Sequence, residues 1–375
     1  MVDPHTIGIT VNLNAGSITP QIISRLKRFQ EDNSGRVQLY LSRDLDEAQE
    51  HFETIKERGH HILTAAGGDG SLASKINAFQ SQMQNRSESP YFALTKLGTG
   101  NAVAKVVGAT RSFEEQLGRV LLEKNLRKIP YIDIPLLGVE MLGEESPSFS
   151  DPQYFTFAGA GWDGLVLNDY QDLGQKYSAT WQRPFTHGLL GYFVSGFGKT
   201  LPTELAKNSF RSASLYVPKD TLAYKVNQGE TEIINTNEFS ETQTGTIDLL
   251  ETIDGPVQAV FAGTTPYFGY GVKAFPRAIH AWHYQGGPLF EVRVIVGKPS
   301  KILPTFIPKA LASWSIPDHY AVHSFLVPEL EVHYFGSVEA AESHIGGDGC
   351  GRQRALRFST INTPILRAID YRKLQ

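Results

Sequence analysis

The chain has 375 residues, of which 41% are hydrophobic and 20% are charged, and its formal net charge is −4 at pH 7. This profile is that of a globular chain long enough for two domains, and it excludes a disordered, collagen-like or coiled-coil protein. No overall basic field is present to hold nucleic acid. The single cysteine, Cys350, excludes an internal disulfide and a thiolate metal cluster. The N-terminus lacks a signal-peptide pattern and no apolar stretch is long enough to cross a bilayer, so we expect a cytoplasmic protein.

The first 130 residues alternate short β-rich runs with helical periodicity. Strands are expected at residues 7–13, 37–41, 61–66 and 91–95, and helices are expected to begin near residues 20, 44, 71 and 112. Thr19 is placed to cap the first helix with Pro20 in its first turn, and Ser112 with Glu115 fits a capping box. The alternation predicts an α/β fold with a doubly wound, mostly parallel N-terminal layer.

From residue 131 onward, β-rich runs dominate. They cover residues 131–137, 154–157, 212–217, 257–262, 290–296, 327–335 and 355–358. One helix is expected between about residues 184 and 200, and the polar stretch 227–246 is either a hairpin or a partly mobile loop. Short strands separated by Gly and Pro predict a β-sandwich-like domain or a partly closed barrel. The expected domains are residues 1–130 and residues 131–375, and the last segment could return to the first domain.

Residues Gly67–Ser71 join a buried strand directly to a helix and carry the strongest chemical signal. Glycines at such a turn let backbone N–H groups approach an anion, and the following helix points its positive end into the same space. Phosphate is the natural ligand of such a turn. The motif is neither a Walker A loop nor a dinucleotide fingerprint. The alternative is a tight turn in which Asp69 is a simple helix cap.

A second glycine-containing turn follows the next strand, at residues Leu97–Asn101. Asn12 and Asn14 end the first strand on the same side. Because open α/β sheets bind ligands beyond the carboxyl ends of their strands, we expect these strand ends to face one crevice.

With these motifs the sequence resembles the diacylglycerol kinase catalytic family, which includes bacterial lipid kinases and sphingosine kinases. NAD kinases share the Gly-Gly-Asp-Gly turn but not the Leu-Gly-Thr-Gly-Asn turn. The first strand is similar to the family's opening Asn-Pro-x-x-Gly element, with Leu13 in place of proline. The resemblance continues through Ile132–Ile134, Gly159–Asp163, Thr264–Gly271 and Phe275–Ala278.

The resemblance implies an ATP-dependent phosphotransferase that uses Mg²⁺ and transfers the γ-phosphate to the hydroxyl of a diacylglycerol or sphingoid-like lipid, with contact limited to the membrane surface. It places the nucleotide at Asn12, Gly67, Gly68, Asp69, Gly70, Ser71, Gly98, Thr99, Gly100 and Asn101. It assigns substrate binding to Asp163 and catalysis to Asp69 and Asp348. The family's Asp-Gly-Glu turn near the C-terminus corresponds to His344–Cys350, in one of two registers. In the first, Asp348 matches the family aspartate and is the general base, and Cys350 replaces the glutamate. In the second, Asp348 replaces the glutamate and Gly346 stands in place of the aspartate.

Two further departures from the family pattern leave alternatives open. The Asp-Gly pair that commonly follows the family's proline-alanine segment, here Phe275–Ala278, is missing, and no carboxylate occurs between that segment and Glu291. Lys96 stands where proline is usual, and either adds a positive charge near the nucleotide or projects into solvent. The chain could therefore be a nucleotide- or lipid-binding member with weak or no kinase activity. A kinase acting on a soluble acceptor such as NAD is a third possibility.

Overall fold

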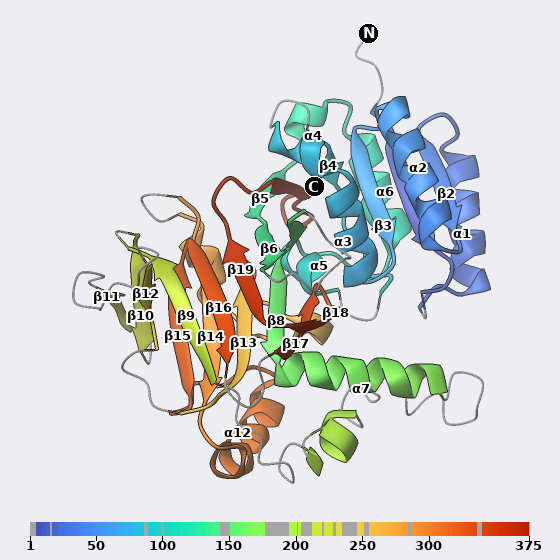
Figure 1. Ribbon diagram of the computed structural model, residues 1–375. Coiled ribbons are helices and arrows are strands. Elements are labelled where there is room, and N and C mark those ends of the chain that lie inside the picture. The colour runs from blue at the N-terminus through green and yellow to red at the C-terminus, as the bar shows by residue number, and fades with distance from the viewer. Residues whose placement is uncertain are drawn as a thin grey trace. The chain divides into compact units, whose positions relative to one another are not determined.

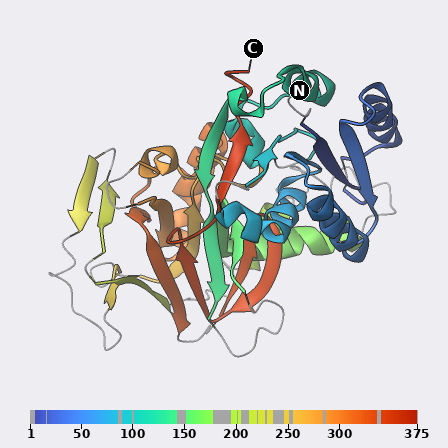
Figure 2. The same ribbon diagram turned by 90° about the horizontal axis from the view of Figure 1, so that it is seen from above.

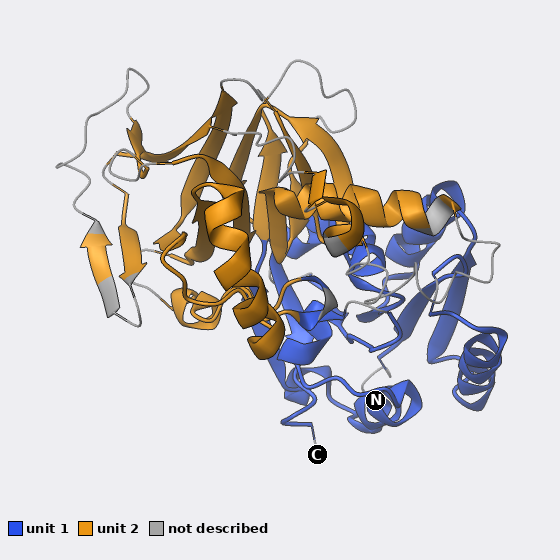
Figure 3. Ribbon diagram, turned by 90° about the horizontal axis from the view of Figure 1, so that it is seen from below, with its two compact units in different colours: residues 1–136, 269–271, 364–375 blue, residues 137–268, 272–363 orange. Residues whose placement is uncertain are grey.

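The computed structural model describes residues 5–15, 17–85, 89–98, 101–142, 151–176, 195–200, 202–203, 212–219, 221–227, 230–234, 246–250, 255–283, 287–335 and 340–374. The chain divides into two compact units (Figure 3). The first unit contains residues 1–136, 269–271 and 364–375, and the second contains residues 137–268 and 272–363.

The first unit is built on a six-stranded sheet (Figure 1). Its strand order is β2 (Val37–Ser42), β1 (Ile7–Asn12), β3 (Ile62–Ala66), β4 (Tyr91–Phe92), β20 (Ile365–Ile369) and β5 (Tyr131–Pro135). All neighbours are parallel except β20 and β5. The chain moves from β1 outward to β2 and then back past β1 to β3, so right-handed crossovers place α1 and α2 on opposite faces. The predicted doubly wound, mostly parallel layer is confirmed.

Helices connect the strands of the first unit. They are α1 (Pro20–Asp32), α2 (Leu45–Arg58), α3 (Asp69–Ala78), α4 (Gln80–Gln84), α5 (Ala102–Val106), α6 (Phe113–Leu122) and the 3₁₀ turn η1 (Leu126–Lys128). The Thr19 hydroxyl accepts the Ile22 N–H at 3.3 Å, as expected of a cap. The expected capping box at Ser112 is wrong: its side chain makes no cap hydrogen bond. The ψ angle of Ser112 is 85°, well short of the 160° of Thr19, so its backbone lacks the extended conformation of a capping residue.

The second unit contains two antiparallel sheets, seen from the front in Figure 1 and from above in Figure 2. The larger has the order β11 (Glu230–Ile234), β10 (Ala223–Asn227), β15 (Val322–Val327), β14 (Phe290–Val296), β13 (Val257–Gly263), β8 (Phe157–Gly161), β17 (Ala341–Ile345) and β18 (Asp348–Gln353). The smaller has the order β12 (Thr246–Asp248), β9 (Ser212–Pro218), β16 (Glu329–Phe335), β19 (Ala355–Ser359), β6 (Leu137–Met141) and β7 (Gln153–Phe155). The central strands β13 and β14 are buried along their whole length. The predicted sandwich-like class is confirmed.

Helical segments lie between the strands of this unit. They are α7 (Trp162–Lys176), the π-helical turn η2 (Gly196–Thr200), α11 (Ala278–Ala281) and α12 (Pro299–Ser313). The 3₁₀ turn η4 (Gly269–Gly271) belongs to the first unit. Most of the helix expected at 184–200 lies outside the described residues. In the polar stretch, β10 and β11 pair antiparallel, and residues 228–229 and 235–245 lie outside the described residues. Among the described helices, none has the length and apolar character needed to span a membrane.

Candidate nucleotide site and its supporting residues

The two glycine turns of the first unit lie directly against each other. A Cβ atom on Gly98 would overlap three backbone atoms, namely the Gly68 Cα, the Gly68 nitrogen and the Gly67 carbonyl oxygen. A Cβ on Gly67 would overlap the Ser71 side chain. Glycine at these two positions is therefore a condition for the close approach of the turns. The structure brings together two motifs that lie 30 residues apart in the sequence, as expected for the ends of neighbouring parallel strands.

Asp69 links the two turns through its carboxylate. Both of its oxygens accept the backbone N–H of Ala102, at 3.0 and 3.1 Å, and the side chain is only 8% exposed. Ala102 is the first residue of α5, so the carboxylate satisfies an N–H group at the positive end of that helix. Asp69 thus caps a helix, as the alternative interpretation proposed, but the helix is α5 and not its own helix α3. Its catalytic role stays a prediction.

Asn101 holds the second turn closed from its far end. Its backbone takes the left-handed conformation, with φ at 52°, which asparagine tolerates better than most residues. Its side-chain amide donates to the Gly98 carbonyl and its side-chain oxygen accepts the Gly98 N–H at 3.1 Å. The Ser17 hydroxyl donates to the Leu97 carbonyl. Thr99 and Gly100 lie outside the described residues.

A pocket connects the two turns at the end of the parallel strands. It is lined by Ala65, Gly67, Gly68, Asp69, Leu72, Leu94, Thr95, Asn101 and Ala104. Of the predicted nucleotide residues, Asn12, Gly70, Ser71 and Gly98 are not part of this lining. Asn12 lies at the same edge of the sheet, because Val11 pairs with Ala66. Its side-chain oxygen accepts the Asn14 N–H at 2.9 Å and shapes the turn after β1.

The helix starts at this pocket differ in what they offer to an anion. The start of α5 is occupied by the Asp69 carboxylate, whereas α3 begins at Gly68 with no side-chain cap. The first N–H groups of a helix have no partner within the helix, and the helix dipole makes this end positive. The start of α3 is therefore the end at which an anion such as a phosphate would be stabilised.

Lys96 directly precedes the second turn and lies near other positively charged side chains. Burial, together with repulsion from Lys105 and Arg111, lowers the pKa of Lys96. The Lys105 ammonium donates to the Gly271 carbonyl at 3.3 Å. Lys96 is half-buried, so it lies against the protein and not wholly in solvent, and a role for its charge near the nucleotide stays a prediction.

Lys75 is a residue of this region that sequence reasoning missed. It lies on the buried face of α3, is completely buried, and donates to the Thr64 carbonyl of β3 at 2.6 Å. Burial lowers its pKa well below the usual value. The bond ties α3 to β3 just behind the first glycine turn. The available signal was a lysine on the same helix face as Leu72 and Ile76.

In the second unit, the predicted substrate residue Asp163 contacts His344. Asp163 is at the start of α7 and His344 is on β17, and both side chains are buried. The His344 Nε2 and Asp163 Oδ2 atoms lie within hydrogen-bonding distance. Gly159 on β8 makes room for the pair, because a Cβ there would lie 2.9 Å from the His344 Nε2. His344 was not predicted as a site residue, because its partner lies 181 positions away.

Asp348 lies exposed at the start of β18, in the hairpin with β17. Partial desolvation raises the pKa of its carboxyl, and His344 opposes the rise. Since the side chain is exposed, we expect solvent to keep the rise small. Burial and Asp348 raise the pKa of the Cys350 thiol to about 12, so this cysteine stays protonated at neutral pH. In the register that puts Cys350 in place of the family's glutamate, the protonated thiol does not supply the negative charge of that glutamate.

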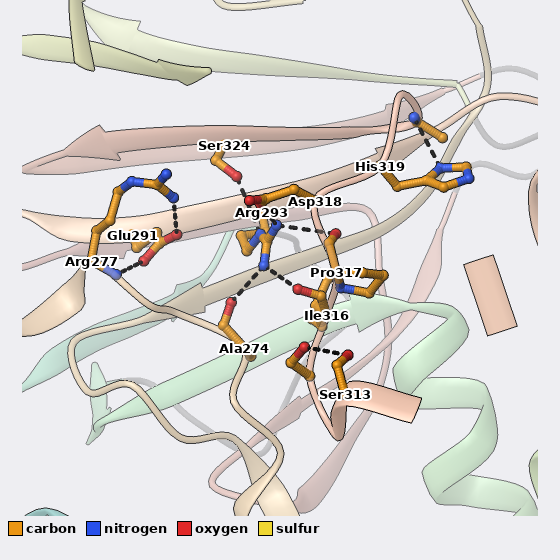
Figure 4. Close-up of polar contacts among 12 residues, drawn as sticks. Ala274, Arg277, Glu291, Arg293, Ser313, Ile316, Pro317, Asp318, His319 and Ser324 are labelled. Atoms are coloured by element: carbon orange, nitrogen blue, oxygen red, sulfur yellow. Dashed lines mark hydrogen bonds and ion pairs between the residues drawn. The ribbon is translucent and has the colours of Figure 1, made fainter. Parts of the chain in front are cut away.

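The proline-alanine segment is held by two buried charged residues of β14 (Figure 4). Arg293 is 1% exposed; its guanidinium donates to the Ala274 carbonyl at 3.2 Å and pairs with Asp318 at 2.9 Å. Glu291 is completely buried and accepts the Arg277 N–H at 2.8 Å. Burial raises the pKa of Glu291 to about 7, against the pull of Arg277 and Arg293. Sequence reasoning gave neither residue a role, because both lie inside an apolar strand.

Comparisons with known proteins show what this chain is similar to. Residues 7–134 match the family model described as the diacylglycerol kinase catalytic domain. No curated protein matches the sequence. A candidate diacylglycerol kinase from Bacillus anthracis str. Sterne is 12% identical, with a TM-score of 0.55 over 99% of this chain and 98% of that chain. A second structure of that description gives 0.54 at 12% identity, over 98% of each chain. Yeast NADH kinase complexed with NADH gives 0.46 at 10% identity, over 98% of this chain and 84% of that chain.

The matched region begins at β1 and contains both glycine turns, the Asp69–Ala102 link and the pocket. The fold likeness extends over both units. Residues 7–134 therefore form a domain of the diacylglycerol kinase catalytic family.

Proposed function

We propose that this protein is an ATP-dependent lipid kinase that transfers the γ-phosphate of ATP to the hydroxyl of a diacylglycerol or sphingoid-like lipid. The observation that carries the proposal is the contact of Gly98 with the Gly67–Gly68 backbone beside the uncapped start of α3. Glycines where the two turns approach leave backbone groups uncovered beside the pocket at this sheet edge. Such a surface suits an oligophosphate better than a neutral metabolite.

The residues of the first unit would act by binding and orienting the phosphates. The N–H groups at the start of α3 would donate to phosphate oxygens, and Lys96 would add positive charge beside the second turn. Asp69 would keep α5 in place through Ala102. In phosphoryl transfer, positioning and charge stabilisation supply most of the rate enhancement, so rigid turns are an advantage.

Magnesium would reach this site together with ATP. The described residues contain no group of three His, Cys, Asp or Glu side chains arranged to hold a metal ion. Mg²⁺ commonly keeps several waters and binds through one or two carboxylates plus substrate phosphates, so a complete protein cage is not needed. When bound, the ion would neutralise phosphate charge. Asp69 would supply a carboxylate ligand to the ion, because it lines the pocket.

The acceptor hydroxyl must lose its proton as its oxygen bonds to the γ-phosphorus and ADP leaves. We assign this proton to Asp348, whose carboxylate is exposed and whose pKa is raised, both of which suit a base. Asp163, held by His344, would bind the acceptor hydroxyl. The larger antiparallel sheet carries both residues on or beside its strands.

The test is incubation of the protein with γ-labelled ATP, Mg²⁺ and a panel of diacylglycerol, sphingoid bases and NAD, followed by separation of the products. The proposal predicts label in a phospholipid, and Asp348→Asn should lower kcat without changing the affinity for ATP. Label in a soluble acceptor alone would contradict the proposal. So would full activity of Asp348→Asn.

A binding protein with weak or no kinase activity is the second candidate. It is favoured by the protonated thiol of Cys350 and by Asp69, whose two oxygens both face the Ala102 N–H. ATP binding without turnover on every acceptor would support this candidate.

A further inference from the structure

Helix α12 (Pro299–Ser313) packs on the second unit through a narrow face. Only Pro299, Ile302 and Leu303 are buried. In Figure 1 the helix lies off the ends of β14 and β15, between which it occurs in the chain. One side of α12 therefore anchors the helix, and the opposite side is open to solvent.

The outward side of α12 is also apolar. Pro304, Ile307, Pro308 and Leu311 follow the spacing i, i+3, i+4 and i+7, which places them on one face of a helix. Pro304, Pro308 and Leu311 are exposed, Leu311 by 46%, and Ile307 is half-buried. A surface helix of a water-soluble protein normally keeps this side polar. The outward stripe therefore fits a partner that removes it from water.

Lysines flank this stripe. Lys301 and Lys309 are exposed, and neither makes an ion pair with any residue that the structure describes. No acidic residue occurs from 299 to 313. The next carboxylate along the chain, Asp318, is paired with Arg293. The edge also carries Tyr320, which is 69% exposed and whose hydroxyl donates to the Lys301 carbonyl at 3.0 Å.

We propose that this α12 face, formed by Pro304, Ile307, Pro308 and Leu311 with Lys301 and Lys309, is the surface that contacts a bilayer containing anionic lipids. Apolar side chains with cationic neighbours and an amphipathic tyrosine match the boundary between acyl chains and head groups. A second copy of the chain fits less well, because a two-fold contact would bring its lysines against each other. The inference rests on the proposed function, since a lipid kinase must reach a substrate held in a membrane.

The test is sedimentation of the full-length protein with sucrose-loaded vesicles, of phosphatidylcholine alone or with phosphatidylserine. We expect binding to the anionic vesicles that weakens with salt. Lys301→Ala with Lys309→Ala should lower the partition coefficient about twenty-five-fold, at about fivefold for each lysine. Lys27→Ala with Lys124→Ala is the matched control, since both are exposed lysines of the first unit and their loss changes the net charge equally.

The apolar part of the α12 face is tested by Leu311→Ser, with Leu122→Ser, 80% exposed on α6, as its control. Leu311→Ser should reduce vesicle binding and leave phosphorylation of a short-chain dispersed lipid unchanged. Equal binding by both lysine pairs, or equal sedimentation with neutral and anionic vesicles, would overturn the inference. A dimer in light scattering that Leu311→Ser dissociates would overturn it in favour of a second copy. Vesicle binding without transfer to any lipid would instead count against the proposed function alone.

Discussion

Substitution of Gly98 by alanine tests the contact between the two turns. The added Cβ would overlap the Gly68 Cα, the Gly68 nitrogen and the Gly67 carbonyl oxygen. Because these are backbone atoms, no side-chain rotation can relieve the overlap and the turns must separate. Overpacking usually costs about 1–3 kcal/mol of unfolding free energy, and we expect a value near the top of that range. Each hydrogen bond to a phosphate that is lost is worth about 1.5–3 kcal/mol, so the Kd for ATP should rise at least about tenfold.

The matched control is Gly118→Ala, in the interior of α6. A Cβ there meets no atom within 4 Å, so the change should stabilise the protein by about 0.5–1 kcal/mol and leave ATP binding unchanged. Both variants are measured by chemical unfolding and by titration calorimetry with ATP and Mg²⁺. Unfolding energies and Kd values that agree for the two variants would refute the packing argument.

Three further predictions concern buried groups with defined partners. Asp69→Asn keeps one acceptor for the Ala102 N–H and should cost about 1 kcal/mol of unfolding free energy. Asp69→Ala removes the acceptor and should cost about 1–3 kcal/mol. Equal thermal unfolding of the two variants would argue against the cap. The pKa of Glu291 is about 7 in the folded protein, against an ordinary value of 4.5. Between these two pH values the folded state keeps a proton that the unfolded state has lost. This group should therefore reduce the free energy of unfolding by about 3 kcal/mol as pH rises from 4.5 to 7. Glu291→Gln should remove that pH dependence, and an unchanged difference between pH 5 and pH 8 in urea unfolding would contradict the assignment. A double-mutant cycle of His344→Ala and Asp163→Ala should show a coupling of about 1–3 kcal/mol, and additive losses would mean that the buried contact is unimportant.

The sheet of the first unit and its turns were predictable because their signals are local. Thr19 and the glycine turns act within a few residues of their own position. Parallel strands end at one edge, so the meeting of the two turns also followed from the strand pattern. The partner of Asp69 was not predictable, because Ala102 lies 33 residues away and is reached only when both helices are in place.

The second unit was harder to predict because its helices lack clean helical signals. Helix α12 contains Pro304 and Pro308, which normally end a helix. Helix α7 follows directly on β8 and contains Gly164 and Gly174, so its helical pattern was not recognised within the β-rich sequence around it. Tertiary packing holds both helices against their local propensities.

The buried polar contacts of the second unit depend on distant parts of the chain. His344 meets Asp163 across 181 positions, and Arg293 meets Asp318 across 25. A residue type alone does not show such a partner, and the neighbours of Arg293 in β14 suggest only an apolar strand. Ser112 shows the opposite failure, because the capping motif is present but the backbone before α6 turns away from the conformation it needs.

Hydrogen–deuterium exchange with and without ATP and Mg²⁺ tests the central claim most directly, because it reports on the backbone N–H groups that would hold the phosphates. The account predicts that ATP slows exchange in both peptides, the one with Gly67–Ser71 and the one with Leu97–Asn101, and that both effects have the same dependence on ATP concentration. Unchanged exchange in either peptide at saturating ATP would contradict a single phosphate site built from the two turns.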